Sequence, residues 1–214
     1  EDFLKRAVYP VVIDPLVQTS DASADMEDNF VTSLAPNTVQ EPTAGFLRIS
    51  KDTEHGECRS FIRFTDLPYF MPSNMVTKAY LRLQLTKQVG AVDVPVYLKE
   101  VMEYWAADTI TWNNQPVLSE GDIDVEVMEA GSAIGSIAEY DVSNSVRKWY
   151  EEGNFGLALL TKENATPNLV EFGSSDNATY KPVVLINYVS FAGIQPQFAY
   201  DVFSCDRAGT VYAN

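Results

Sequence analysis

The segment "KAYLRLQLT", Lys78 to Thr86, sets the expectation for the fold. Its apolar residues occupy every second position, at Ala79, Leu81, Leu83 and Leu85. Because successive side chains of a β-strand point to opposite faces, this spacing predicts a strand with one buried and one solvated face. Such half-buried strands are typical of antiparallel sheets.

The same period-two pattern recurs along the chain between turn-rich separators such as "APNT" and "KENATPN". In "DIDVEVM" it predicts that Ile123, Val125 and Val127 face inward. In "TITW" it predicts a strand over Thr109 to Thr111, with Trp112 buried. Further strands are predicted at Tyr9 to Ile13, Asn29 to Leu34, Phe46 to Ile49, Ser60 to Phe64, Val94 to Val101, Gly156 to Thr161, Leu169 to Gly173 and Val183 to Val189.

One segment, "YDVSNSVRKWYEEGNFG", has helical spacing instead. Its apolar residues fall on one helical face, and Gly153 supplies a stop. We expect a short helix from Ser143 to Glu152, with Asp141 or Ser143 capping its first amides. A single helix in a chain of alternating strands predicts an all-β, antiparallel two-sheet sandwich with one short crossover helix. The residues that define the helical face are Val142, Val146, Trp149 and Tyr150.

Length and charge restrict the classes of partner. The chain has 214 residues, 46% of them hydrophobic, which suits one domain with extensions. It carries 30 acidic and 15 basic residues, a net charge of -15, and this charge repels nucleic acid and anionic lipid. Nowhere does the sequence contain the roughly eighteen consecutive apolar residues of a membrane span, so we expect no membrane insertion.

The residues needed for catalysis or for a metal centre are sparse. His55 is the only histidine, and Cys58 three residues later makes a nucleophile pair conceivable, although a solvated loop histidine is the simpler interpretation. Cys58 and Cys205 lack metal-site spacing, so we expect two free thiols, with one disulfide as the alternative. We therefore predict no enzyme, no catalytic residues and no metal or other cofactor. Calcium at the acidic clusters "DASADMEDN" and "EGDIDVE" is the alternative, although neither has the EF-hand spacing.

The stretch "WAADTITWNNQP", Trp105 to Pro116, has two interpretations. It can be a structural device that buries its tryptophans and uses its amides to satisfy the loop backbone. It can also be a ligand site, because an aromatic surface with a few polar groups suits a sugar ring. The ligand-binding candidates are then Tyr104 and Trp105 for stacking and Asn113, Asn114 and Gln115 for hydroxyl groups, with Tyr69 and Phe70 as a second aromatic pair.

These segments together resemble a known family. In order and spacing, "FVTSLAPNT", "RSFIRFTDLP", "YLRLQLTK", "VPVYLKEV", "WAADTITWNNQP", "YDVSNSVRKWYEEGNFGLALLTK" and "VEFGSSDNATYKPVVLINY" are similar to the DNRLRE domain. The resemblance extends from Asp28 to Tyr188 and implies a jelly-roll sandwich like those of carbohydrate-binding modules. "YPVVIDP" resembles the segment before such a domain in Rhs-type wall-associated proteins, and "DRAGTVYAN" resembles the start of their tyrosine-aspartate repeats.

The resemblance implies a non-catalytic module of a large secreted bacterial surface protein, associated with the cell wall. Such a module would bind cell-wall or extracellular polysaccharide, or would act only as a spacer before the repeat region. Its other partners would be neighbouring modules of the same long protein. We expect the present chain to be a piece of that protein. We expect a lead-in segment over residues 1–20, the sandwich over 21–190, and a linker with the start of the repeats over 191–214.

Overall fold

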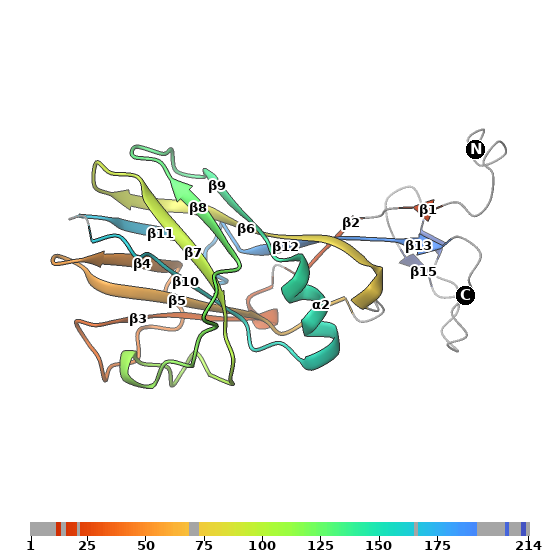
Figure 1. Ribbon diagram of the computed structural model, residues 1–214, viewed down its shortest axis with the longest axis horizontal. Coiled ribbons are helices and arrows are strands. Elements are labelled where there is room, and N and C mark those ends of the chain that lie inside the picture. Colours follow the sequence, from red (N-terminus) through yellow and green to blue (C-terminus); the bar gives the residue numbers. More distant parts are fainter. Residues whose placement is uncertain are drawn as a thin grey trace. The chain divides into compact units, whose positions relative to one another are not determined.

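The computed structural model describes residues 12–13, 16–20, 22–68, 73–164, 167–191, 204–205 and 211–212 (Figure 1). The chain divides into two compact units: Leu16–Tyr188, and a second unit made of Glu1–Pro15 and Val189–Asn214. In the second unit β1 (Val12–Ile13) pairs with β13 (Ser190–Phe191), and β14 (Ser204–Cys205) pairs with β15 (Val211–Tyr212). The first unit contains the predicted sandwich.

The sandwich is antiparallel throughout its described strand pairs, and its two layers can be followed in Figure 1. One layer contains β2 (Leu16–Gln18), β12 (Val183–Tyr188), β6 (Val76–Val89), β9 (Ile137–Asp141), β11 (Leu169–Gly173) and β4 (Phe46–Asp52). The other contains β3 (Met26–Thr32), β5 (Gly56–Phe64), β10 (Leu157–Leu160), β7 (Val94–Glu100) and β8 (Asp124–Met128). Strand β4 pairs with both β11 and β5, so it joins the layers. The fold is the predicted all-β sandwich of jelly-roll type.

The main core lies between these layers and follows from the alternation of the strands. The apolar positions of "KAYLRLQLT" in β6 are all fully buried, as predicted, whereas the alternate residues Tyr80, Arg82 and Gln84 are partly or fully exposed. Alternate residues of β7, namely Val94, Val96 and Leu98, belong to the same buried cluster. The period-two pattern therefore determines which face of each strand enters the core.

Helix α2 spans Ser143–Glu152, as predicted. Val146 and Trp149 are buried in the main core, and Asp141 accepts a hydrogen bond from the backbone N–H of Ser143 at 3.0 Å. Gly153 ends the helix with a φ of 101°, a left-handed value that favours glycine. Three short 3₁₀ turns complete the described helices: η1 (Ser23–Asp25), η2 (Ser73–Met75) and η3 (Trp112–Asn114).

The predicted strand over Thr109 to Thr111 is wrong. Thr109 lies in a turn, Thr111 precedes η3, and Trp112 is only half-buried, with the Arg59 guanidinium carbon 4.9 Å from its ring centroid. The Asn114 side chain accepts hydrogen bonds from both the backbone N–H and the hydroxyl of Thr111, which closes a turn. Local amide bonds of this kind compete with strand pairing and explain why β-branched residues did not form a strand here.

The predicted facing is wrong for Val125 and Val127 of β8, although Ile123, just before the strand, packs against the main core as predicted. Val125 and Val127 are exposed, while Asp124 and Glu126 are partly buried on the opposite face. The Asp124 carboxylate accepts hydrogen bonds from the backbone N–H groups of Val125 and Asp141, and this ties β8 to the start of the connection into α2. Burial, together with the nearby carboxylates of Asp124 and Glu139, raises the pKa of Glu126. The hydrogen bonds of Asp124 thus determine which face of this short edge strand turns inward, against its apolar pattern.

Asp28 in β3 gives the sandwich a testable pH dependence. Burial raises the pKa of its carboxyl group from 3.8 to about 6, although a hydrogen bond from the Ser175 backbone N–H opposes the rise. Between pH 3.8 and about pH 6 the folded state binds more protons than the unfolded state, so the free energy of unfolding falls as pH rises through this range. Asp28→Asn keeps an acceptor for Ser175 without a charge. We expect it to be more stable than the parent at about pH 7 by up to about 3 kcal/mol, with the difference vanishing near pH 4.

Urea denaturation of both proteins at the two pH values measures this effect. Asp66→Asn, which changes an exposed carboxylate, is the matched control and should leave the pH dependence as it is in the parent. An Asp28→Asn protein that is less stable than the parent at both pH values would contradict the prediction.

Candidate functional site

The loop between β7 and β8 covers the outer face of the layer that contains β3, β5 and β10. It starts with a single bridge between Val101 and Leu118. Beneath it lies a second buried cluster, formed by Val31, Phe61, Val101, Trp105, Ile110 and Ala158. Because this cluster anchors the loop to a sheet, the side chains that the loop exposes are held on a rigid support.

Trp105 is part of that support and offers little surface to a ligand. Its side chain is only 5% exposed, its ring lies 5.7 Å from that of Phe61, and its indole N–H donates a 2.8 Å hydrogen bond to the Phe155 carbonyl. The interpretation of Trp105 as a stacking surface does not fit this environment, because the ring faces are covered. The structural interpretation of the same residue does fit.

Tyr104 is the exposed ring of the pair, with 69% of its surface accessible. The Arg63 guanidinium carbon lies 4.8 Å from the centroid of this ring. Arg63 in turn forms an ion pair with Glu27, and the other Glu27 oxygen accepts the Ala107 backbone N–H at 2.7 Å. The Arg63 guanidinium therefore orients the Tyr104 ring, and Glu27 links Arg63 to the loop backbone.

A pocket of about 180 Å³ opens beside Tyr104. Its lining residues are Tyr104, Trp105, Ala106, Thr109, Ile110 and Asn114. Three of the residues expected at a ligand site, Tyr104, Trp105 and Asn114, thus meet at one place. The Asn114 amide donates a 3.0 Å hydrogen bond to the Thr109 carbonyl, so it also shapes the pocket wall.

The other predicted site residues lie apart from this pocket. The Asn113 amide bonds to the Asn37 side chain at 2.8 Å, and Gln115 accepts a 3.0 Å hydrogen bond from Arg59. The Gln115 amide also donates a 2.7 Å hydrogen bond to the Trp112 carbonyl, so Gln115 satisfies the loop backbone as the structural interpretation predicts, whereas the Asn113 amide bonds to another side chain. Tyr69 and Phe70 lie outside the described residues.

Sequence reasoning missed several exposed apolar residues in this loop and next to it. Met102 is 53% exposed and Val117 is 61% exposed, and the Met102 backbone N–H donates a 2.9 Å hydrogen bond to the Val117 carbonyl. Phe155 is exposed as well, and its carbonyl accepts the Trp105 N–H. We call the exposed ring of Tyr104 the Tyr104 surface. Single apolar residues in loops carry no period, so no sequence signal distinguishes them.

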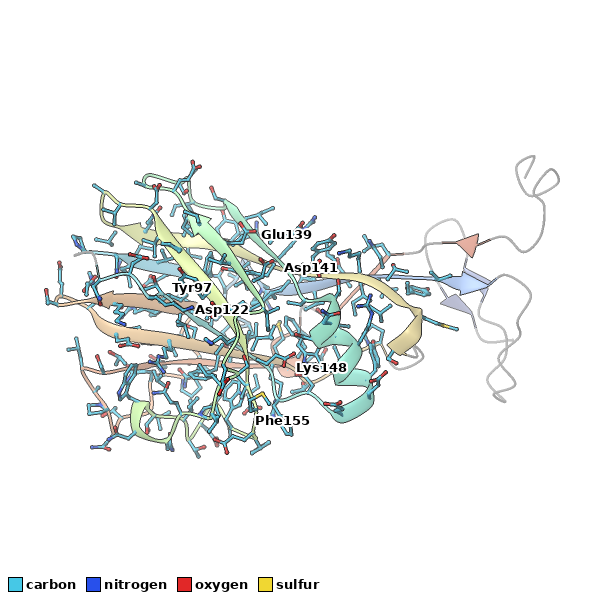
Figure 2. The ribbon with its side chains drawn as sticks, viewed as in Figure 1. Tyr97, Asp122, Glu139, Asp141, Lys148 and Phe155 are labelled. Carbon is cyan, nitrogen blue, oxygen red and sulfur yellow. The ribbon has the colours of Figure 1, made fainter. Side chains whose placement is uncertain are left out.

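A second and larger hollow, the polar cleft, measures about 600 Å³. Lys148 pairs with Glu100 at 2.8 Å, and Lys78 pairs with Asp141 at 2.7 Å. Burial acts to raise the pKa of Asp141, but hydrogen bonds from Lys78 and Ser143 lower it to about 2, so its carboxylate is charged at neutral pH. Three of the residues that line this cleft, Asp122, Asp141 and Lys148, are labelled in Figure 2. The cleft is lined by Thr77, Lys78, Glu100, Ser119, Gly121, Asp122, Ile123, Asp124, Asp141, Ser143, Asn144, Ser145, Arg147 and Lys148.

The histidine and the cysteine that were candidates for chemistry have local structural contacts. The His55 ring lies 3.0 Å from the Asp52 carboxylate, while the Cys58 thiol is buried and lies 3.6 Å from the His55 backbone carbonyl, not from the ring. Cys58 is a free cysteine, and the Cys205 side chain lies outside the described part. Among the residues that the structure describes, no group of three or more His, Cys, Asp or Glu side chains could hold a metal ion.

In the part of the chain that the structure describes, no helix has the length and apolar character needed to cross a membrane.

Comparison with known proteins assigns the family. The chain is 30% identical over 211 residues to the tRNA3(Ser)-specific nuclease WapA of Bacillus spizizenii. That alignment covers 92% of this chain but only 8% of the nuclease, so the chain corresponds to a small part of that protein. The sequence profile of carbohydrate-binding module family 96 matches residues 19–188, which include every strand of the sandwich except β2. The chain therefore belongs to carbohydrate-binding module family 96.

Proposed function

We propose that this chain is a non-catalytic module that binds polysaccharide through the Tyr104 surface and its pocket. The observation that carries the proposal is an exposed tyrosine, 69% accessible, which stacks on Arg63 and lines a pocket with an amide in its wall. A sugar ring has apolar C–H faces and hydroxyl edges, so it can stack on the ring and bond to the amide. Membership of a carbohydrate-binding module family supports this ligand class.

We further propose that the module belongs to a long, secreted bacterial surface protein of the Rhs type and binds cell-wall or extracellular polysaccharide there. The similarity to 8% of a much longer protein supports a modular context. The nuclease activity in that relative's name describes the relative. The net charge of -15 favours neutral or basic polymers, such as partly deacetylated amino-sugar chains, over polyanions.

Affinity electrophoresis against immobilised polymers tests the proposal. The panel comprises peptidoglycan fragments, neutral glucans, partly deacetylated chitin and a uronate polymer. We expect the parent chain to be retarded by a neutral or basic polymer. Tyr104→Ala should weaken binding at least about tenfold, the effect of losing about 1.4 kcal/mol of stacking, whereas Tyr104→Phe should bind nearly as well because it keeps the ring.

Ile137→Ala is the matched control, because Ile137 is an exposed apolar residue on β9, outside both the pocket and the polar cleft. If Tyr104→Ala binds as tightly as the parent, the Tyr104 surface is not the site. If no polymer retards the parent, the chain acts as a spacer without a ligand of its own.

A further inference from the structure

We infer that the sandwich is attached to its long protein as a side branch, because the segments before and after it pair with each other. The inference rests on the proposed place in a longer protein, but it does not depend on the ligand. It follows from the pairing of four strands: β2 and β12, which belong to the sandwich, and β1 and β13, which belong to the flanking unit.

The chain enters and leaves the sandwich on neighbouring strands. Leu16, the first residue of β2, is the antiparallel partner of Asn187 near the end of β12. Just inside the sandwich, the Thr19 N–H donates a 2.9 Å hydrogen bond to the Val184 carbonyl, and the Val184 N–H donates to the Thr19 hydroxyl at 3.0 Å. Thr19 is buried, so this pairing is part of the folded sandwich. The Cα atoms of such partners lie about 4.5–5.5 Å apart.

The flanking segments pair in the same way. Val12 of β1 is the antiparallel partner of Phe191, and Ile13 is the partner of Ser190, both in β13. Two residues of chain separate β1 from β2, and one residue separates β12 from β13. No other element is therefore inserted between the two pairings on either side.

Both pairings have one register. Going back three residues from Leu16 leads to Ile13, and going forward three residues from Asn187 leads to Ser190, which is the partner of Ile13. Two unrelated strand pairs would have no reason to share a register, because register is set separately wherever strands meet. The shared register therefore indicates that the same two chain segments belong together on both sides of the boundary.

This connectivity determines how the module is carried. A module connected in series enters at one end and leaves at the other, so it adds its own length to the chain. Here the whole sandwich adds only the spacing of two neighbouring strands, about 5 Å. Tension along the long protein then acts on the paired flanks, and a ligand on the sandwich lies outside that path. The spacer alternative means a module that keeps other molecules away from the flanks, and not one that lengthens the chain.

A disulfide across the flanks of the full chain tests the inference. Ile13→Cys/Ser190→Cys is made in a Cys205→Ser background, where the remaining native thiol, Cys58, is buried. Partner Cα atoms lie within disulfide range, so mild oxidation should cross-link most molecules, as peptide mass mapping would show. Oxidation should also raise the melting temperature by at least about 5 °C, because the new loop encloses the sandwich and restricts the unfolded chain.

Val12→Cys/Ser190→Cys is the matched control, because it shifts the pair by one residue and neighbouring residues of a strand point to opposite faces. It should cross-link at least about tenfold less. Val12→Cys/Phe191→Cys is a second in-register pair and should cross-link like the first. Equal yields for the shifted and in-register pairs, or no cross-link in either in-register pair, would overturn the side branch.

Polymer binding separates this inference from the proposed function. The oxidised and reduced forms should be retarded equally by the polymer that binds the parent, because the Tyr104 surface is not part of the flanks. If no polymer retards any of these proteins, the proposed function fails, whereas the cross-linking result still decides the side branch.

Discussion

Replacing Trp105 by alanine should lower the free energy of unfolding by about 3–5 kcal/mol, the usual cost of removing a large aromatic side chain from a packed interior. The ring is 5% exposed, packs on Phe61 and donates its N–H to the Phe155 carbonyl. Its loss opens a cavity beneath the loop and removes that hydrogen bond. The melting temperature, followed by circular dichroism, should fall by roughly 6–20 °C.

Trp112→Ala is the matched comparison, because Trp112 lies in the same loop but is only half-buried against Arg59. Trp112→Ala should lower the free energy of unfolding by only about 1 kcal/mol. Equal losses for the two variants would mean that Trp105 is not the anchor of the loop.

Gly173→Ala should destabilise the sandwich by more than about 4 kcal/mol or prevent folding. Gly173 ends β11, where an added Cβ would lie 1.6 Å from the backbone carbonyl oxygen of Tyr180 and 2.7 Å from its carbonyl carbon. Both atoms belong to the backbone, so no side-chain rotation relieves the overlap, and the segment after β11 must move. Soluble expression and urea denaturation measure the effect.

Gly121→Ala is the control, because an added Cβ at Gly121 has no atom within 4 Å and the residue has no left-handed φ. Its stability should stay close to that of the parent. A Gly173→Ala protein with parental stability would show that the connection from β11 to β12 can shift freely.

The long strands and the helix could be predicted because each carries its own period. The nine-residue segment from Lys78 to Thr86 and the helix from Ser143 to Glu152 repeat their patterns often enough to identify both type and face. Strand β9, Ile137–Asp141, was missed. It follows a glycine-containing loop and has too few apolar positions, Ala138 and Tyr140 on its buried face, to stand out.

Two sequence-based errors have a common physical cause. Around Thr111 and at Asp124 a polar side chain captures nearby backbone N–H groups, and this local bonding determines the chain path or the strand facing against the apolar pattern. Intrinsic strand preference is worth less than such bonds in short segments, particularly at a sheet edge.

The candidate site was predictable only in part. Tyr104 and Asn114 could be selected because aromatic and amide residues cluster in one short stretch, and the structure brings both to the same pocket. The polar cleft could not be predicted, because Lys78, Glu100, Asp122 and Lys148 lie on separate elements that only the folded sandwich assembles. Whether Trp105 or Tyr104 faces solvent depends on the packing of the loop over Phe61, which sequence spacing does not encode.

Amide chemical-shift mapping of the full chain during titration with the oligosaccharide that binds is the most direct test of the proposed site. The account predicts that the largest shifts cluster at Tyr104, Ala106, Thr109 and Asn114, which line the pocket. Shifts confined to the outer faces of β6 and β9, or a bound ligand that leaves the amides around Tyr104 unperturbed, would contradict it.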